Sequence, residues 1–173
     1  MNLLPPVFRH CPFCGNSLGT REEEGHQRSY CHACQWTYYP RVAISVSTII
    51  TRGKEVLLVK RRREPYKGTW MFPSGFNDYG EHPEETARRE VREETSLTVT
   101  GLILRAVCQS PDDPREPGHI MFFYDARVAP GEIATDPDEN EAIDWFPINA
   151  PPLIGWELHQ RFMAELQEQH RAS

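Results

Sequence analysis

The order of apolar and polar residues along the chain predicts a succession of strands and helices. Residues 42–62 are dense in valine, isoleucine and leucine on both sides of Gly53-Lys54, which is typical of two strands joined by a turn. Residues 97–108 and 119–128 predict further strands. Between residues 155 and 169 the apolar spacing predicts a closing amphipathic helix with an apolar side made of Trp156, Leu158, Phe162, Met163 and Leu166.

An earlier helix is predicted from Pro83 to about Ser96. Proline suits the first helical position because its missing N–H would have no partner there, and the glutamates that follow are favoured by the helix dipole. With about 3.6 residues per turn, Glu90, Glu93 and Glu94 share one face. Such a face is either a solvated acidic surface or a site for a hard cation such as Mg²⁺, which binds carboxylates and substrate phosphates.

The residues around this helix resemble the signature of the Nudix hydrolases. Eight of its nine constrained positions match, and they are Gly75, Glu81, Arg89, Glu90, Val91, Glu93, Glu94 and Leu97. At the ninth position Ser96 replaces a glycine, and we expect slight strain there because that glycine follows the helix in a left-handed conformation. The resemblance covers roughly residues 41–170 and implies an α/β/α sandwich around a mixed sheet.

The resemblance also implies a site for divalent metals. Glu90, Glu93 and Glu94, together with the backbone carbonyl of Ser74, are expected to hold one to three Mg²⁺ or Mn²⁺ ions. These metals would neutralise a diphosphate and activate a water molecule. Glu81 is expected to support the loop or the outer shell of the site.

The expected catalytic residues are Glu93, Glu94, Arg89 and a general base. In relatives the matching arginine holds the signature carboxylates in place by charge-assisted hydrogen bonds. Relatives often carry an extra glutamate at the position of Glu139, which is therefore the first candidate for the base. Glu141 is the second candidate.

The first forty residues form a different unit. Cys11 and Cys14 make one CxxC pair, and Cys31 and Cys34 make a second pair sixteen residues further on. This spacing indicates a structural zinc ribbon, with a closed shell of four sulfurs. Two disulfides are the alternative, but the N-terminus lacks the apolar region of a secretory signal. We therefore predict a zinc ribbon over 1–40 and a Nudix domain over 41–173.

The charge distribution bears on the partners. The net charge is −6, yet residues 1–40 are about neutral, which argues against a nucleic-acid partner. Aromatic residues of this segment either stack on a base or pack the ribbon against the main domain. Basic residues between 52 and 67 either clamp a diphosphate or form a solvated strand end. With no membrane-spanning run and no targeting segment, we expect a cytoplasmic enzyme, and the resemblance suggests a homodimer.

The expected substrate is a dinucleotide or a sugar nucleotide. A ribbon before a Nudix domain resembles the NADH pyrophosphatases and a shorter group linked to FAD or ADP-ribose. The NADH group carries Ser-Gln-Pro-Trp-Pro-Phe-Pro after the signature, whereas residues 108–114 here read Cys-Gln-Ser-Pro-Asp-Asp-Pro. This difference favours FAD or ADP-ribose, with release of AMP. Two alternatives stay open: a ligand sensor without turnover, and an enzyme that removes a nucleotide cap from RNA.

Overall fold

The computed structural model describes residues 8–135 and 137–172. The chain divides into two compact units, and the division falls after Val42. Each unit has its own sheet, and none of the strands in the described residues is shared between the two sheets. Each unit therefore has its own hydrogen-bonded framework.

The first unit is a three-stranded antiparallel sheet. Its strands are β1 (Gly19–Glu23), β2 (His26–Cys31) and β3 (Trp36–Thr37). Glu24 and Gly25 connect β1 to β2, and both have positive φ angles, as a tight two-residue hairpin requires. Among the described residues of this unit only Cys11 and Cys31 are buried, so its apolar core is minimal.

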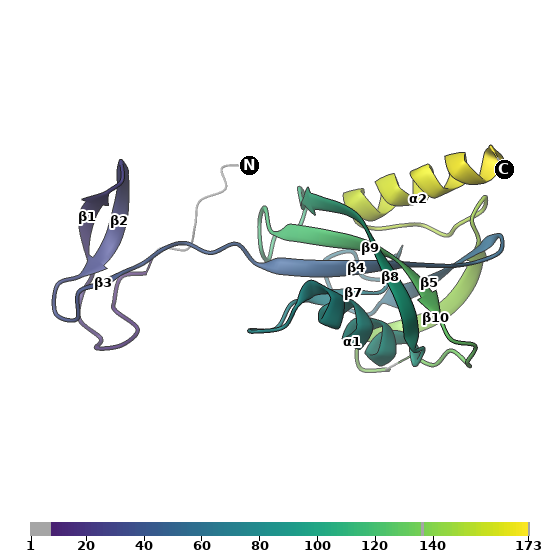
Figure 1. Ribbon diagram of the computed structural model, residues 1–173, viewed down its shortest axis with the longest axis horizontal. Coiled ribbons are helices and arrows are strands. Elements are labelled where there is room, and N and C mark those ends of the chain that lie inside the picture. Colours follow the sequence, from purple (N-terminus) through teal and green to yellow (C-terminus); the bar gives the residue numbers. More distant parts are fainter. Residues whose placement is uncertain (1–7, 136, 173) are drawn as a thin grey trace. The chain divides into compact units, whose positions relative to one another are not determined.

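The second unit is built around a mixed sheet (Figure 1). The main path runs in the order β10-β5-β4-β9-β8, and only β4 and β9 pair in parallel. Two short strands extend the pairing, β6 along β5 and β7 along β4. The strands are β4 (Ile44–Arg52), β5 (Glu55–Arg61), β6 (Trp70–Met71), β7 (Ser74–Phe76), β8 (Val99–Gln109), β9 (Ile120–Val128) and β10 (Asn140–Pro147).

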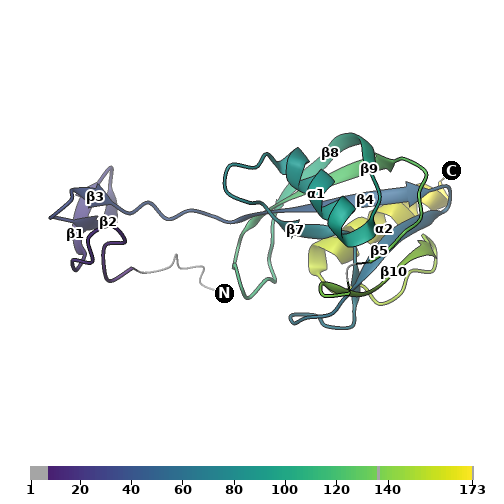
Figure 2. The same ribbon diagram turned by 90° about the horizontal axis from the view of Figure 1, so that it is seen from below.

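Helices α1 (Pro83–Thr95) and α2 (Glu157–Arg171) cover opposite faces of this sheet (Figures 1 and 2). Neighbouring residues of a strand point to opposite faces, so Ile49 packs with the apolar side of α2 and Ile50 packs with Val91 of α1. The predicted apolar side of the closing helix is buried as expected. The predicted α/β/α sandwich around a mixed sheet is confirmed.

Both ends of α1 follow from local sequence. His82 caps the first turn, where its side chain accepts a hydrogen bond from Glu84 N–H and its own N–H donates to Glu85. Pro83 follows at the first helical position. At the other end, Ser96 adopts the left-handed conformation with a φ of 63°. The expected local strain at this replaced glycine is therefore present in the backbone.

Candidate active site

Glu94 lies at the centre of the acidic face, between α1 and the sheet. One carboxylate oxygen accepts a hydrogen bond from the backbone N–H of Ser74 at 2.8 Å, and the other accepts from the Asn140 amide at 2.9 Å. The residue is only 3% exposed. Both donors are neutral, and burial raises the pKa of Glu94 to about 8. This carboxylate is therefore buried with hydrogen bonds but without a directly bonded cation.

Glu90 lies one turn earlier, pressed against the backbone of β7. A Cβ atom at Gly75 would come within 1.9 Å of a Glu90 carboxylate oxygen, so only glycine leaves room for this side chain. Arg89 donates to the same carboxylate at 2.5 Å. Burial nevertheless raises the pKa of Glu90 to about 7. The loop before α1 is thus shaped around the carboxylate.

Arg89 links the acidic residues of the loop and the helix. Its guanidinium donates to both oxygens of Glu81, to Glu93 at 3.0 Å and to the backbone carbonyl of Phe76 at 3.0 Å. The hydrogen bonds from Arg89 lower the pKa of Glu81 to about 2. Arg89 therefore fixes the carboxylates by bidentate and charge-assisted contacts.

The remaining predicted acids lie in different surroundings. The Glu93 side chain is about half exposed, at 49%, at the open side of the helix. Glu139 lies close enough that its charge adds to the burial that raises the pKa of both Glu90 and Glu94. Glu141 instead pairs with Lys60 at 3.1 Å. Of the two candidates for the general base, Glu139 is the one whose charge acts on the site.

A divalent cation fits the chemistry of these carboxylates, although the oxygens of Glu90, Glu93 and Glu94 do not all lie within 4.8 Å of one another as the four sulfurs of the first unit do. Glu90 and Glu94 are both more than nine-tenths buried, and buried carboxylates require a cation or a proton to offset their lost hydration. Hard cations such as Mg²⁺ bind carboxylate oxygens and keep positions for water and phosphate. Ser74 donates its backbone N–H to Glu94, so the Pro73–Ser74 peptide lies beside that carboxylate, and the role of the Ser74 carbonyl as a metal ligand stays a prediction.

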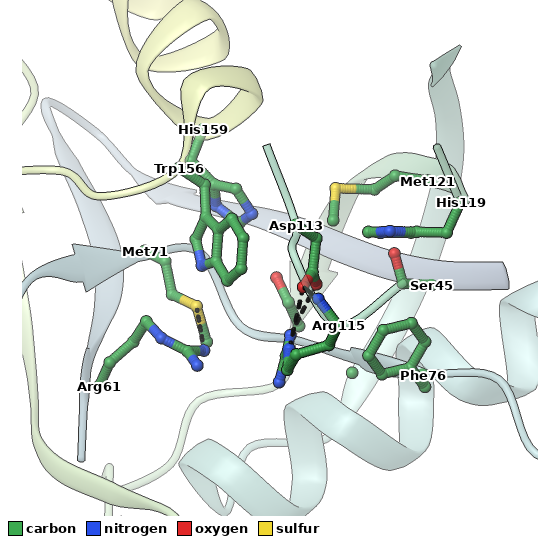
Figure 3. A pocket seen from close by; sticks show the side chains of 12 residues that line it. Ser45, Arg61, Met71, Phe76, Asp113, Arg115, His119, Met121, Trp156 and His159 are labelled. Carbon is green, nitrogen blue, oxygen red and sulfur yellow. Dashed lines mark hydrogen bonds and ion pairs between the residues drawn. The ribbon is translucent and has the colours of Figure 1, made fainter. Parts of the chain in front are cut away.

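A cavity of about 140 Å³ adjoins these residues (Figure 3). It reaches Ser74 and Gly75, which lie against Glu94 and Glu90, so it borders the acidic face of α1. The other lining residues come from separate parts of the chain, and they include Ser45, Arg61, Phe76, Asp113, Arg115, His119, Trp156 and His159. Sequence reasoning missed most of this cavity. In the sequence, the loop 111–118 is marked only by its prolines and aspartates.

The basic residues between 52 and 67 and the aromatic residues next to the signature differ in whether they line the cavity. Of the seven basic residues between 52 and 67, only Arg61 lines the cavity. Phe76 also lines it, whereas Phe72 is fully buried in the core and Tyr79 is 99% exposed. A base could therefore contact Phe76 but not Phe72.

The four cysteines of the first unit converge. Their donor atoms all lie within 4.8 Å of one another, and no other group of three or more histidine, cysteine or acidic residues among the described residues meets that limit. All five cysteines are free thiols, so the alternative of two disulfides does not apply to this structure. Cys14 and Cys34 are exposed, while Cys11 and Cys31 are buried.

The comparison with known families agrees with this geometry. A model described as the NUDIX domain matches residues 40–166. The chain therefore belongs to the Nudix family.

Relatives with assigned names share both units of the chain. Proteins named NAD-capped RNA hydrolase NudC are 33% identical in Pseudomonas fluorescens and 35% identical in Pseudomonas aeruginosa. Each alignment covers 91% of this chain, so it extends well into the four-cysteine unit. The matches cover 55% and 56% of those proteins, so the chain spans about half the length of these relatives.

Solved structures share the fold. A Nudix hydrolase from Nitrosomonas europaea has a TM-score of 0.77 at 24% identity, and the match covers 95% of this chain and 93% of that one. The Nudix domain of NrtR from Shewanella oneidensis, solved with ADP-ribose, has a TM-score of 0.63 at 19% identity, with 83% and 94% coverage. No helix among the described residues is long and apolar enough to cross a membrane. The homodimer and the cytoplasmic location stay predictions.

Proposed function

We propose that this chain hydrolyses the diphosphate bond of an ADP-containing nucleotide with the help of Mg²⁺ or Mn²⁺. The observation that carries the proposal is the pair of buried carboxylates, Glu90 and Glu94, beside a cavity lined by arginines. Two buried acids call for cations, and the adjoining arginines favour an anionic substrate. A ligand sensor would need neither so complete an acidic set nor its fixed geometry.

Each acidic residue has a distinct proposed role. Glu90, Glu93 and Glu94, with the Ser74 carbonyl, hold the cations, and Arg89 keeps the carboxylates in position. When bound, the cations offset phosphate charge and lower the pKa of a bound water. Glu139 takes the proton from the water that attacks phosphorus, and the diphosphate bond breaks to give two phosphate monoesters. Its closeness to Glu90 and Glu94 supports this assignment over Glu141.

Among possible substrates, a dinucleotide of the NAD type, including one that caps RNA, is now the first candidate. The named relatives support it, because they match the ribbon and the Nudix domain together. This weakens the sequence-based preference for FAD or ADP-ribose and the expectation that nucleic acid is not a partner. FAD and ADP-ribose remain the second candidates, because they share the ADP half and the bond to be cleaved.

We also propose that the four cysteines bind Zn²⁺ as a structural ion. Four sulfur donors in two CxxC pairs form a closed tetrahedral shell, which leaves no position for a substrate. Because this unit buries so little apolar surface, the ion would supply much of its folding free energy. Measuring zinc per chain, before and after a thiol reagent, tests this assignment.

A product assay tests the proposed activity. The protein with Mg²⁺ is offered NAD-capped RNA, NADH, FAD and ADP-ribose, and mass spectrometry identifies the products. We expect cleavage at the diphosphate to give AMP or an RNA with a 5′-monophosphate, and a loss of at least about 100-fold in Glu94→Gln, since metal stabilisation of phosphate charge is worth several kcal/mol. Glu84→Gln, an exposed acid on the same helix, is the matched control. Equal rates in all three proteins would refute the proposed site.

A further inference from the structure

The cavity beside the acidic face has the size of a single aromatic ring. Its volume is about 140 Å³, similar to a cavity of about 150 Å³ that binds benzene in another protein. The rings of Phe76 and Trp156 contribute apolar surface to its lining. A flat ring is therefore a fitting occupant, with any larger ligand extending out through the opening.

Two polar atoms in this lining have no hydrogen-bond partner. Ser45 is 4% exposed and His119 is 2% exposed, and Ser45 Oγ and His119 Nε2 are both buried and unpaired. Of the buried unpaired side-chain atoms found among the described residues, these are the two that belong to residues lining the cavity. Buried polar atoms are normally satisfied, so their arrangement points to a polar ligand.

The tautomers of His119 and His159 define which hydrogen-bond donors and acceptors the ligand must have. His119 Nδ1 lies 2.9 Å from the Glu116 carbonyl, which can only accept, so Nδ1 carries the proton and Nε2 is an acceptor in the neutral ring. On the other side, His159 Nδ1 accepts from the Phe72 N–H, so the proton of this neutral ring lies on Nε2. Burial and the nearby charge of Arg61 lower the pKa of His159 to about 3, which keeps its ring neutral.

Two guanidinium groups add positive charge to the same cavity (Figure 3). Arg61 and Arg115 lie 5.2 and 5.6 Å from the centroid of the Trp156 ring. Arg115 is paired with Asp113 at 2.7 Å, whereas Arg61 donates to the neutral Pro65 carbonyl and to the Met71 sulfur. An anion beside Arg61 would offset this charge and reduce its repulsion with Arg115.

We infer that this cavity binds the ring of the substrate nucleotide by an edge that places a donor next to an acceptor, as in a carboxamide or an aminopyrimidine. Ser45 and His119 bind that edge with His159, and Phe76 contacts the ring. Arg61 contacts the diphosphate, which extends from the ring in the cavity to the acidic face of α1. The inference rests on the proposed function, since it names how that substrate is recognised.

Binding of mononucleotides tests the inference without turnover. Calorimetry with nicotinamide mononucleotide, AMP and ribose 5-phosphate separates the ring from the phosphate. We expect at least one of the two ring-bearing ligands to bind more tightly than ribose 5-phosphate. Ribose 5-phosphate binding as tightly as both would overturn the inference.

Two further ligands identify the ring. Nicotinic acid mononucleotide replaces the carboxamide by a carboxylate, and inosine monophosphate reverses the donor and acceptor of the adenine edge. Weaker binding of the first relative to nicotinamide mononucleotide assigns the cavity to a carboxamide ring. Weaker binding of the second relative to AMP assigns it to adenine. If nicotinic acid mononucleotide binds as tightly as nicotinamide mononucleotide, and inosine monophosphate as tightly as AMP, the cavity does not recognise the polar edge of the ring and the inference fails.

Variants test the two polar residues. Ser45→Ala should weaken binding of the preferred ligand by about three- to tenfold, the usual range for one lost hydrogen bond. Ser47→Ala is the matched control, because this buried serine on the same strand also has an unpaired hydroxyl but does not line the cavity. His119→Leu provides a second variant, with its melting temperature checked. Unchanged affinity in both Ser45→Ala and His119→Leu would overturn the inference.

The same assays separate this inference from the proposed function. Ring-dependent binding without hydrolysis of any dinucleotide would retain the cavity assignment and refute the enzyme. If Ser45→Ala and Arg61→Gln hydrolyse the substrate with a normal KM, the proposed hydrolase activity would stand, but the proposed binding of the ring in the cavity would be refuted. For Arg61→Gln we expect a KM raised about tenfold, and Arg52→Gln, an exposed arginine paired with Glu55, is its control.

Discussion

The four-cysteine unit and the Nudix domain both gather metal ligands, but in opposite settings. In the first unit Cys11 and Cys31 are the only buried residues among those described, and the four sulfurs all lie within 4.8 Å of one another. In the Nudix domain the sheet and both helices enclose large apolar clusters, and Glu90 and Glu94 are buried beside them. A metal ion would complete the fold of the four-cysteine unit, whereas in the Nudix domain it would neutralise buried carboxylates.

The difference follows from the number and type of ligands. Four thiolates fill the coordination shell of zinc, so the ion has no open position and acts as a structural link. Three carboxylates leave positions on Mg²⁺ for water and phosphate. The Nudix domain can hold such buried charges because its apolar core stabilises the fold. The four-cysteine unit has almost no apolar core of its own. The comparison makes predictions in which the two units respond differently.

The largest expected effect is loss of the ribbon in Cys31→Ser. Removing one buried thiolate breaks the shell, and structural zinc is worth about 10–16 kcal/mol in zinc-finger peptides. We expect the NMR signals of residues 8–42 to collapse to unfolded positions while those of the Nudix domain remain dispersed. Cys108→Ser, outside the cluster, should leave both sets unchanged. Cooperative loss of both units would contradict their independence.

Gly75→Ala should impair the catalytic site and, to a smaller extent, the fold. The added methyl group would meet Glu90 at 1.9 Å and expel its carboxylate from the site. We expect a loss of activity of about 100-fold, from a displaced cation ligand, and a loss of about 1–3 kcal/mol in unfolding free energy. Gly101→Ala is the control, because the nearest atom to its added Cβ is 4.0 Å away. Retained activity in Gly75→Ala would show that Glu90 is dispensable.

The third prediction concerns pH and separates the acids from the rest of the domain. Burial raises the pKa of Glu90 to about 7 and of Glu94 to about 8, so without metal the folded state holds protons that the unfolded state releases near pH 4.5. The contribution of these two protonated glutamates to the unfolding free energy is therefore fully present below pH 4.5, and it is lost as the pH rises through 7 and 8. His159, with its pKa lowered to about 3, acts oppositely, but only below pH 6.5.

The informative window for this effect is pH 6.5 to 8.5. Chemical unfolding of metal-free protein should show decreasing stability across it, and saturating Mg²⁺ should reduce or reverse the slope, since the cation favours the charged carboxylates. Glu94→Gln should have a flatter profile without metal. A metal-free stability that rises across this window would be incompatible with protonated, buried glutamates.

The smallest effect is expected at the end of α1. Ser96 has a φ of 63°, a conformation that glycine adopts at no steric cost. Ser96→Gly should raise the unfolding free energy by up to about 1 kcal/mol, reduced by loss of the hydroxyl contact with the Ala134 carbonyl. The melting temperature of the Nudix domain measures this change, and the ribbon should not respond. A destabilised domain would mean that the hydroxyl contact outweighs the backbone strain.

The parts of the fold that sequence predicted are those encoded locally. The strands before and after Gly53, the helix starting at Pro83 and the paired cysteines each depend on residues close together in the chain. The left-handed Ser96 was also predictable, since one replaced glycine in a known pattern marks it. These features need no knowledge of which segments meet in space.

The cavity was not predictable because its residues meet only after folding. Ser45 lies on β4, His119 follows a loop rich in proline, and Trp156 precedes α2. Arg61 was one of seven basic residues with the same signal, and only the structure separates it from neighbours such as Lys60, which pairs with Glu141. The preference for FAD or ADP-ribose relied on one loop motif, and relatives over the whole chain outweigh it.

The proposed chemistry depends on the binding of divalent cations by the acidic face of α1. Titration of Mn²⁺ into the protein, followed by electron paramagnetic resonance of the free ion, measures this directly in the wild type, Glu94→Gln and the exposed control Glu84→Gln. We expect saturable binding in the wild type and Glu84→Gln, with affinity at least about tenfold weaker in Glu94→Gln. Equal Mn²⁺ affinity in all three proteins would contradict it.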